Sequence, residues 1–220
     1  MKKLTKVKIC CISSVDEAAL AIKYGASALG FVSQMPSGPG VISDEQITGI
    51  MRSVPENIDS FLLTSETSAE KIIEQHEKFK TNTIQLVDNV DIEVYREVSR
   101  KLPGTVIVQV VHVTNAGSVE YAIEISQYVD AILLDSGNPD LKVKELGGTG
   151  RVHNWQLSRK IRDKVNVPVL LAGGLNPENV RDAIKTVEPY AVDLCSGVRT
   201  NDKLDQIKLK KFFEAVNYNN

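Results

Sequence analysis

The stretch "PVLLAGGLNPENV" (168–180) contains the parts of one complete strand–turn–helix unit. Its apolar start, "PVLLAG" (168–173), is typical of a strand buried on both faces, as in a parallel sheet. After a glycine turn, "NPENVRDAIKTV" (176–187) has helical period, with Asn176 as the expected N-cap and Pro177 at the first helical position. The stretch therefore predicts one β/α unit.

The same alternation of apolar strand and amphipathic helix runs along the whole chain. Further helices are predicted at "SVDEAALAIKYG" (14–25) and "SAEKIIEQHEKF" (68–79). With 168–173, the predicted strands are "KVKIC" (6–10), "ALGFV" (28–32), "DSFLLT" (59–64), "TIQLV" (83–87), "TVIVQVVHV" (105–113), "AILLD" (131–135) and "AVDLCS" (191–196). Eight such units in 220 residues, with no Pro/Ser-rich linker, favour an α/β protein with one closed (β/α)8 barrel, a TIM barrel, as a single domain over residues 1–220.

Composition excludes several classes of partner. A hydrophobic fraction of 42%, a charged fraction of 25% and a formal net charge of -2 give no electrostatic sign of nucleic-acid binding. No apolar run is long enough to span a membrane, and "MKKLTKVKIC" (1–10) lacks the apolar core of a secretory signal. Three cysteines are odd in number and too few for a disulfide framework, so we expect a reducing, cytoplasmic setting.

In barrels of this class, chemistry gathers where the strands end and the next loops begin. Gly173 and Gly174 lie between a strand and a helix, and Ser196 and Gly197 follow the next strand. Backbone without side chains lets N–H groups approach an anion, and a helix N-terminus favours its charge. These four residues are predicted to bind phosphate; the alternative is that the glycines only form tight turns.

Two adjacent cysteines end the first predicted strand. Because neighbouring strand residues point to opposite faces, Cys10 is expected to face the barrel axis and Cys11 the helices. A thiol of ordinary pKa ~8.5 acts as a base where positive charge favours its thiolate. Cys10 is therefore either a base or a small buried hydrophobe, whereas Cys11 and Cys195 are predicted to be packed and inert.

Charged residues also lie within the predicted strands or at their ends. Asp135 ends "AILLD", where buried surroundings would raise its pKa and keep it protonated; the alternative is a cap for the following turn. Lys8 has two interpretations, a Schiff-base amine or an ion pair with Asp193 on the last strand, which adjoins the first in a closed barrel. We favour the ion pair.

The remaining histidines and the tryptophan are given structural roles. His112 ends a predicted strand and could face the barrel axis, although a solvated loop position is favoured. His76 is expected on an exposed helix face, while His153 lies in the long loop "SGNPDLKVKELGGTGRVHN" (136–154). Histidines so scattered predict no metal site. Trp155 is expected to anchor the start of a helix.

An ordered set of motifs resembles phosphoribosylanthranilate isomerase of tryptophan biosynthesis over nearly the whole chain. The matching pieces are "KIC" (8–10), "ALGFV" (28–32), "IQL" (84–86), "LLD" (133–135), "GGTG" (147–150), "LAGGLNPENV" (171–180) and "VDLCSGV" (192–198). The resemblance implies a (β/α)8 barrel that catalyses an Amadori rearrangement of a small phosphorylated sugar conjugate without a cofactor. The oligomeric state stays open, with a homodimer as one option.

By this resemblance Cys10 is the general base and Asp135 the general acid. Asp135 would protonate the ribose ring oxygen and open the furanose to a Schiff base; Cys10 would then remove the C2′ proton, giving an enolamine that becomes the ketone. Cys10, the weaker acid, must be ionised, and Asp135, the stronger acid, must be protonated, as in matched acid–base pairs. Lys8, Gln85 and Arg199 are predicted to bind substrate.

Several positions depart from the family pattern. Cys11 replaces a glycine of "KICG", and Gly40 lies near the arginine of "SPR" that is expected to hold the anthranilate carboxylate. Val87 replaces the histidine of "QLHG", and Arg199 replaces the acid of "SGVE". Asn154 stands for the usual aspartate before the tryptophan.

These departures alter the pocket for the aglycone. The residues predicted to bind phosphate and the acid–base pair are retained. Arg199 or Arg151 is a candidate to replace the missing cation. Two other functions stay open: an isomerase or related enzyme for another ribose-phosphate conjugate, and a non-catalytic sensor of phosphoribosyl ligands.

Overall fold

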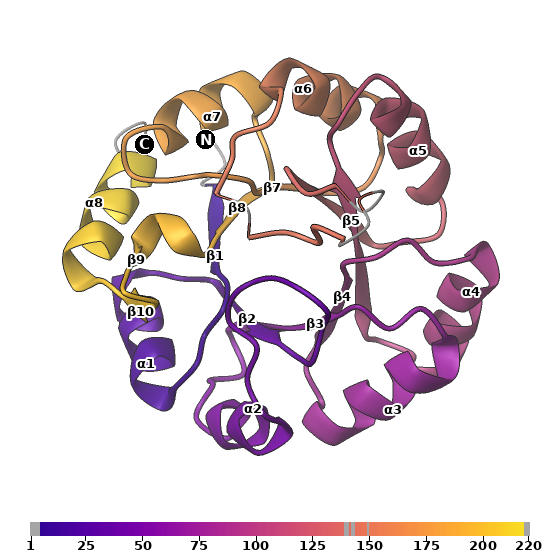
Figure 1. The fold of residues 1–220 in the computed structure, drawn as a ribbon, viewed down its shortest axis with the longest axis horizontal. Coiled ribbons are helices and arrows are strands. Elements are labelled where there is room, and N and C mark those ends of the chain that lie inside the picture. The colour runs from indigo at the N-terminus through magenta and orange to yellow at the C-terminus, as the bar shows by residue number, and fades with distance from the viewer. Residues whose placement is uncertain (1–4, 139–140, 142–143, 149, 218–220) are drawn as a thin grey trace.

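The computed structural model describes residues 5–138, 141, 144–148 and 150–217. Its parallel strands pair in sequence order and close into a barrel, so the predicted (β/α)8 fold is confirmed (Figure 1). Thr149 of the "GGTG" motif and residues 139–140 and 142–143 of the long loop lie outside the described residues. The barrel strands are β1 (Lys6–Ile9), β2 (Ala28–Val32), β3 (Asp59–Thr64), β4 (Thr83–Leu86), β5 (Val106–His112), β6 (Ala131–Asp135), β7 (Val169–Leu171) and β8 (Ala191–Leu194).

The helices form a ring outside the strands, as Figure 1 shows in a view along the barrel. They are α1 (Val15–Tyr24), α2 (Asp44–Met51), α3 (Ala69–Phe79), α4 (Ile92–Lys101), α5 (Gly117–Ile125), α6 (Trp155–Lys164), α7 (Val180–Val187) and α8 (Gln206–Asn217). Within the described residues no helix has both the length and the apolar content that a membrane crossing requires.

Alternation along β1 divides its side chains between two environments. Val7 and Ile9 belong to the apolar layer between strands and helices, whereas Cys10 packs in the barrel interior, so the predicted facing is confirmed. Lys8 is 1% exposed, and its Nζ lies 3.0 Å from Asp193 Oδ1 in the adjacent β8. The predicted ion pair is therefore present, and it gives each buried charge a partner.

Side-chain caps mark the starts of three helices, α1, α2 and α6. Ser14 caps α1 by accepting from the N–H of Glu17, and Asn154 caps α6 at the start that Trp155 was expected to mark. The prediction that Asn176 caps α7 is wrong: that helix begins at Val180. Asn176 instead caps the preceding turn, where its Oδ1 accepts from the N–H of Glu178 at 3.0 Å.

The chain inserts small elements between β8 and α8 that the sequence did not predict. A single 3₁₀ turn, η1 (Ser196–Val198), is followed by the two-residue strands β9 (Arg199–Thr200) and β10 (Lys203–Leu204), which pair antiparallel. The hairpin between these strands turns through two residues with positive φ. Such short elements have too few residues for a periodic pattern.

Candidate active site

The carboxyl ends of the strands surround one cavity of about 680 Å³, part of it open to solvent. The loop after β2 and the loop after β6 meet above it: a Cβ on Gly148 would lie 2.3 Å from Pro39 Cδ. Cys10, Gln85, Asp135, Gly173, Gly174 and Ser196 line this cavity. Most of the residues predicted for the site are thus brought together.

Cys10 lies at the floor of the cavity, 6% exposed, as the one free cysteine of the chain. Burial raises the pKa of its thiol to about 11; the charge of Lys8 opposes this shift, Asp193 adds to it, and a hydrogen bond from the Cys11 N–H opposes it. The charge of Lys8 thus favours the thiolate, as base chemistry requires, but burial outweighs it and the pKa of Cys10 is raised. Lys8 and the Cys11 N–H both favour the thiolate of Cys10, but at neutral pH its side chain is mostly the thiol.

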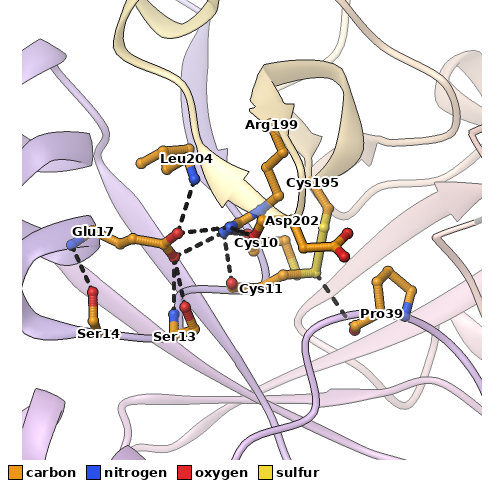
Figure 2. A network of polar contacts seen from close by, with 10 residues as sticks. All are labelled: Cys10, Cys11, Ser13, Ser14, Glu17, Pro39, Cys195, Arg199, Asp202 and Leu204. Carbon is orange, nitrogen blue, oxygen red and sulfur yellow. Dashed lines mark hydrogen bonds and ion pairs between the residues drawn. A yellow bond between two sulfur atoms is a disulfide. The ribbon is translucent and has the colours of Figure 1, made fainter.

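Cys11 does not face the helices as the alternation predicted. It lies beyond the end of β1 in the left-handed region, with φ 61°, and it lines the cavity with Cys10. Its side chain forms a disulfide with Cys195, across a Cα–Cα distance of 5.9 Å (Figure 2). The prediction that both residues are inert thiols is corrected. The sequence did contain a sign of this disulfide, because Cys11 and Cys195 follow neighbouring strands of a closed barrel.

Gly40 explains why a side chain fits at position 11. Gly40 has φ 81°, and a Cβ there would lie 2.4 Å from Cys11 Cβ. The space that a larger residue at position 40 would need is therefore filled by Cys11. The two departures noted in the sequence, cysteine for glycine and glycine for arginine, are parts of one packing arrangement.

We expect Cys11→Gly to affect stability only when the disulfide can form. Under oxidising conditions the variant loses a link across 184 residues and about 2–4 kcal/mol of unfolding free energy. Under reducing conditions the glycine removes the strain of a non-glycine residue in the left-handed region. The free energy of unfolding then changes by less than about 1 kcal/mol. Urea unfolding with and without dithiothreitol measures both, and Cys195→Ser is the control that keeps the strained backbone. Equal losses in both conditions would contradict the disulfide.

Asp135 ends β6 and is 8% exposed. Burial raises the pKa of its carboxyl, while the Ser136 N–H, which donates to Oδ1 at 2.7 Å, opposes the rise. The carboxyl also caps its own turn, so the two sequence interpretations, acid and cap, are compatible. A raised pKa favours the protonated form that a general acid requires.

Gln85 and Lys8, both predicted to bind substrate, lie at different places relative to the cavity. Gln85 of β4 lines the cavity, 3% exposed. Lys8 is absent from the cavity wall and lies beneath it, against Cys10. Burial pulls the pKa of Lys8 down, but Asp193 and then Cys10 more than offset this, so its pKa is raised. A charged amine of this kind is a poor Schiff-base nucleophile, and its charge acts on the Cys10 thiol.

The prediction that Arg199 binds substrate is corrected by the direction of its side chain. Its guanidinium points away from the cavity to Glu17, with Nη1–Oε1 at 2.8 Å, and the side chain is 7% exposed. Arg151, the other candidate cation, pairs with Glu145 at the surface, and its side chain is 59% exposed. No lysine or arginine occurs among the described residues that line the cavity.

The glycines after β7 and β8 occupy positions that only glycine tolerates. Gly173 and Gly174 have φ 80° and 62°. A Cβ on Gly174 would lie 2.7 Å from the Arg151 backbone, and one on Gly197 would lie 1.9 Å from the carbonyl of Leu175. The two loops therefore pack backbone to backbone beside η1, the arrangement that many barrels use for phosphate.

The histidines are more buried than the sequence predicted. His76 and His112 are each 8% exposed, and the Nε2 of His112 donates to the Val87 carbonyl at 3.1 Å. Burial lowers the pKa of His153 to about 4, so this ring is neutral. Its Nδ1 would lie 2.9 Å from a Cβ on Gly173, which places His153 beside the site. Because helix and loop packing covers these rings, their local sequence gave no sign of it.

The closed parallel barrel, with a thiol and a carboxyl in one cavity at its carboxyl end, defines a (β/α)8-barrel enzyme. The model of the N-(5′-phosphoribosyl)anthranilate (PRA) isomerase family matches residues 7–215. The chain belongs to this family of intramolecular isomerases, whose members serve tryptophan biosynthesis.

Relatives and solved structures agree with this assignment. The chain is 36% identical to N-(5′-phosphoribosyl)anthranilate isomerase of Methanosarcina acetivorans, over 96% of this chain and 93% of that protein. It is 35% identical to the enzyme of Halobacterium salinarum, over 89% and 87%. The crystal structure of the Thermotoga maritima enzyme superposes with a TM-score of 0.83 at 32% identity, covering 96% and 98% of the two chains. A structure in complex with reduced 1-(o-carboxyphenylamino)-1-deoxyribulose 5-phosphate gives a TM-score of 0.81 at 30% identity, over 96% and 98%.

Proposed function

We propose that this protein catalyses the Amadori rearrangement of phosphoribosylanthranilate, with Cys10 as general base and Asp135 as general acid. The observation that carries the proposal is that these two groups line one cavity whose rim includes the glycine loops after β7 and β8. Family membership supports the substrate, since the relatives are named for this reaction.

In the proposed reaction the phosphate binds at Gly173, Gly174, Ser196 and Gly197, which places the sugar between the two acid–base groups. Asp135 donates a proton to the ribose ring oxygen, and the ring opens to a Schiff base. Cys10 then takes the proton from C2′, and the enolamine so formed becomes the ketone. Each positioned proton transfer contributes about 10²–10⁴-fold to the rate.

Loss of the fluorescence of freshly made phosphoribosylanthranilate, followed after mixing with purified protein, tests this function. Turnover that depends on enzyme concentration supports it. Binding without turnover, seen as a fluorescence change that stops at one equivalent, would instead identify a sensor.

The cavity wall favours one second candidate, an isomerase for an aglycone without a carboxylate. The described lining residues include Asp135 and Asp193 but no cation to face a carboxylate. A charge-assisted hydrogen bond of that kind contributes about 1.5–3 kcal/mol. If phosphoribosylaniline is turned over with a kcat/KM at least equal to that of phosphoribosylanthranilate, the second candidate replaces the first.

We expect Gly174→Ala to raise KM for the phosphorylated substrate at least tenfold. The new methyl would meet the Arg151 backbone and push the loop from its phosphate-binding shape. Gly104→Ala is the matched control, because Gly104 also has positive φ, at 87°, but no atom lies within 4 Å of the new Cβ. Steady-state kinetics and inhibition by inorganic phosphate measure the effect. An equal KM for the two variants would contradict the assignment of this loop to phosphate.

The assembly and location of the protein are also proposals. A Thermotoga maritima relative, 29% identical, is described as a dimeric isomerase that has been converted to monomers. We propose a homodimer here as well, which light scattering after gel filtration tests. A cytoplasmic location is supported by membership of a biosynthetic family.

A further inference from the structure

Arg199 and Glu17 form a buried ion pair at the edge of the site. Arg199 begins β9, and Glu17 lies in the first turn of α1. Their contacts are bidentate, with Nη1–Oε1 at 2.8 Å and Nη2–Oε2 at 3.1 Å (Figure 2). Glu17 also accepts from the N–H groups of Ser13 and Leu204, at 3.0 and 2.9 Å. The guanidinium is therefore held in one orientation.

The same guanidinium reaches the backbone that follows β1. Its Nη2 donates to the carbonyl of Cys11 at 2.6 Å and approaches the carbonyl of Cys10 at 3.3 Å. Figure 2 shows these bonds converging on the turn from the side of α1, while the disulfide to Cys195 leaves it on the other side. Arg199 thus holds the backbone directly beside the proposed base.

One peptide group links this contact to the sulfur. The carbonyl of Cys10 and the N–H of Cys11 belong to a single planar unit, so fixing the carbonyl fixes the N–H. That N–H acts against the rise in the pKa of the Cys10 thiol that burial causes. A donor aimed at the sulfur favours the thiolate over the thiol.

We propose that Arg199, braced by Glu17, is a positioning residue for Cys10: it holds the Cys10–Cys11 peptide, and with it the sulfur, in one position. Arg199 is not among the residues that line the cavity, and it acts through the backbone. The inference rests on the proposed function, in which Cys10 is the base.

Other charged groups near the sulfur remain in every variant of the test. Lys8 of β1 and Asp193 of β8 act on Cys10 directly, and Asp135 of β6 lines the same cavity. None of these three contacts Arg199 in the described structure, where its partners are Glu17 and backbone carbonyls. A change in Cys10 after substitution of Arg199 is therefore assigned to the peptide.

The test compares Arg199→Met/Glu17→Met with Arg199→Lys. The double variant removes both charges and leaves no buried charge unpaired, which protects folding. Arg199→Lys keeps a cation and a donor, so it is the conservative rescue. Arg162→Met is the matched control, since Arg162 pairs with Glu188 on the outer face of α6 and α7.

Thiolate absorbance at 240 nm, titrated against pH, gives the first result without any substrate. With Cys11 and Cys195 joined, Cys10 is the single titrating thiol, and each variant is corrected by its own Cys10→Ser form. We expect the double variant to have about tenfold less thiolate than the wild type at any pH below the transition. Arg199→Lys should lie within about threefold of the wild type, and Arg162→Met should match it.

Kinetics give the second result: kcat of the double variant at pH 8 falls about tenfold and KM changes less than twofold. A folded double variant whose thiolate titration matches the wild type would overturn the inference and leave Arg199 a scaffold residue. A shifted titration in a protein that does not turn over phosphoribosylanthranilate would support the inference and contradict the proposed function.

Discussion

Cys10→Ala is expected to lower kcat for phosphoribosylanthranilate by about 10³-fold or more, with KM changed less than threefold. The thiol is the proposed acceptor of the C2′ proton, and loss of a positioned general base removes about 10²–10⁴-fold. KM should be spared because the proposed phosphate site is in the loops after β7 and β8 and does not include position 10. The fluorescence assay under saturating substrate gives kcat directly.

Two controls separate chemistry from packing for this variant. Cys10→Ser keeps the size of the side chain but replaces the thiol with a much weaker acid, so it should lose nearly as much activity as Cys10→Ala. Cys195→Ser removes the disulfide and keeps Cys10, so its kcat should stay within about fivefold of the wild type. If Cys10→Ala retained a tenth of the wild-type rate, Cys10 would not be the base.

Asp135→Asn is expected to lower kcat/KM by about 10²–10⁴-fold at pH 7 and to change the shape of the pH profile. In the proposed mechanism the reactive form carries an ionised Cys10 and a protonated Asp135. Burial raises both pKa values, that of Cys10 to about 11. The reactive form is therefore a minor species, and its population is constant between the two pKa values and falls on either side.

In the wild type, kcat/KM should thus rise with pH up to the raised pKa of Asp135, stay level, and fall above about pH 11. Without the carboxyl only the thiolate limits the reaction, so the residual activity of Asp135→Asn should rise with pH across the whole range toward about 11. Asp163→Asn, which changes an exposed acid of α6, is the control and should keep the wild-type profile. A level profile for Asp135→Asn would show that Asp135 is not the acid.

The sequence predicted those features that follow from strand alternation and from barrel closure. Lys8 and Asp193 were expected to meet because the last strand adjoins the first and both residues face inward, and they form an ion pair at 3.0 Å. Cys10 and Asp135 were placed at strand ends, and both line the cavity.

Prediction failed where the chain leaves regular structure. Alternation put Cys11 on the helix side, but a residue with φ 61° beyond the strand end no longer follows a period of two. Arg199 was expected to face the ligand, yet its direction depends on Glu17, 182 residues away in the sequence. His112 was expected in solvent because the loop that covers it, with Gly137 against its ring, cannot be placed from local sequence.

A crystal structure with reduced 1-(o-carboxyphenylamino)-1-deoxyribulose 5-phosphate, the compound in the related isomerase complex, would test the central claim most directly. It should show the Cys10 sulfur about 3–3.5 Å from C2 of the sugar. An Asp135 oxygen should lie within about 2.6–3.2 Å of the oxygen that closes the ring, with the phosphate on Gly174 and Ser196. An analogue bound with either the sulfur or the carboxyl out of contact with the sugar would contradict the account.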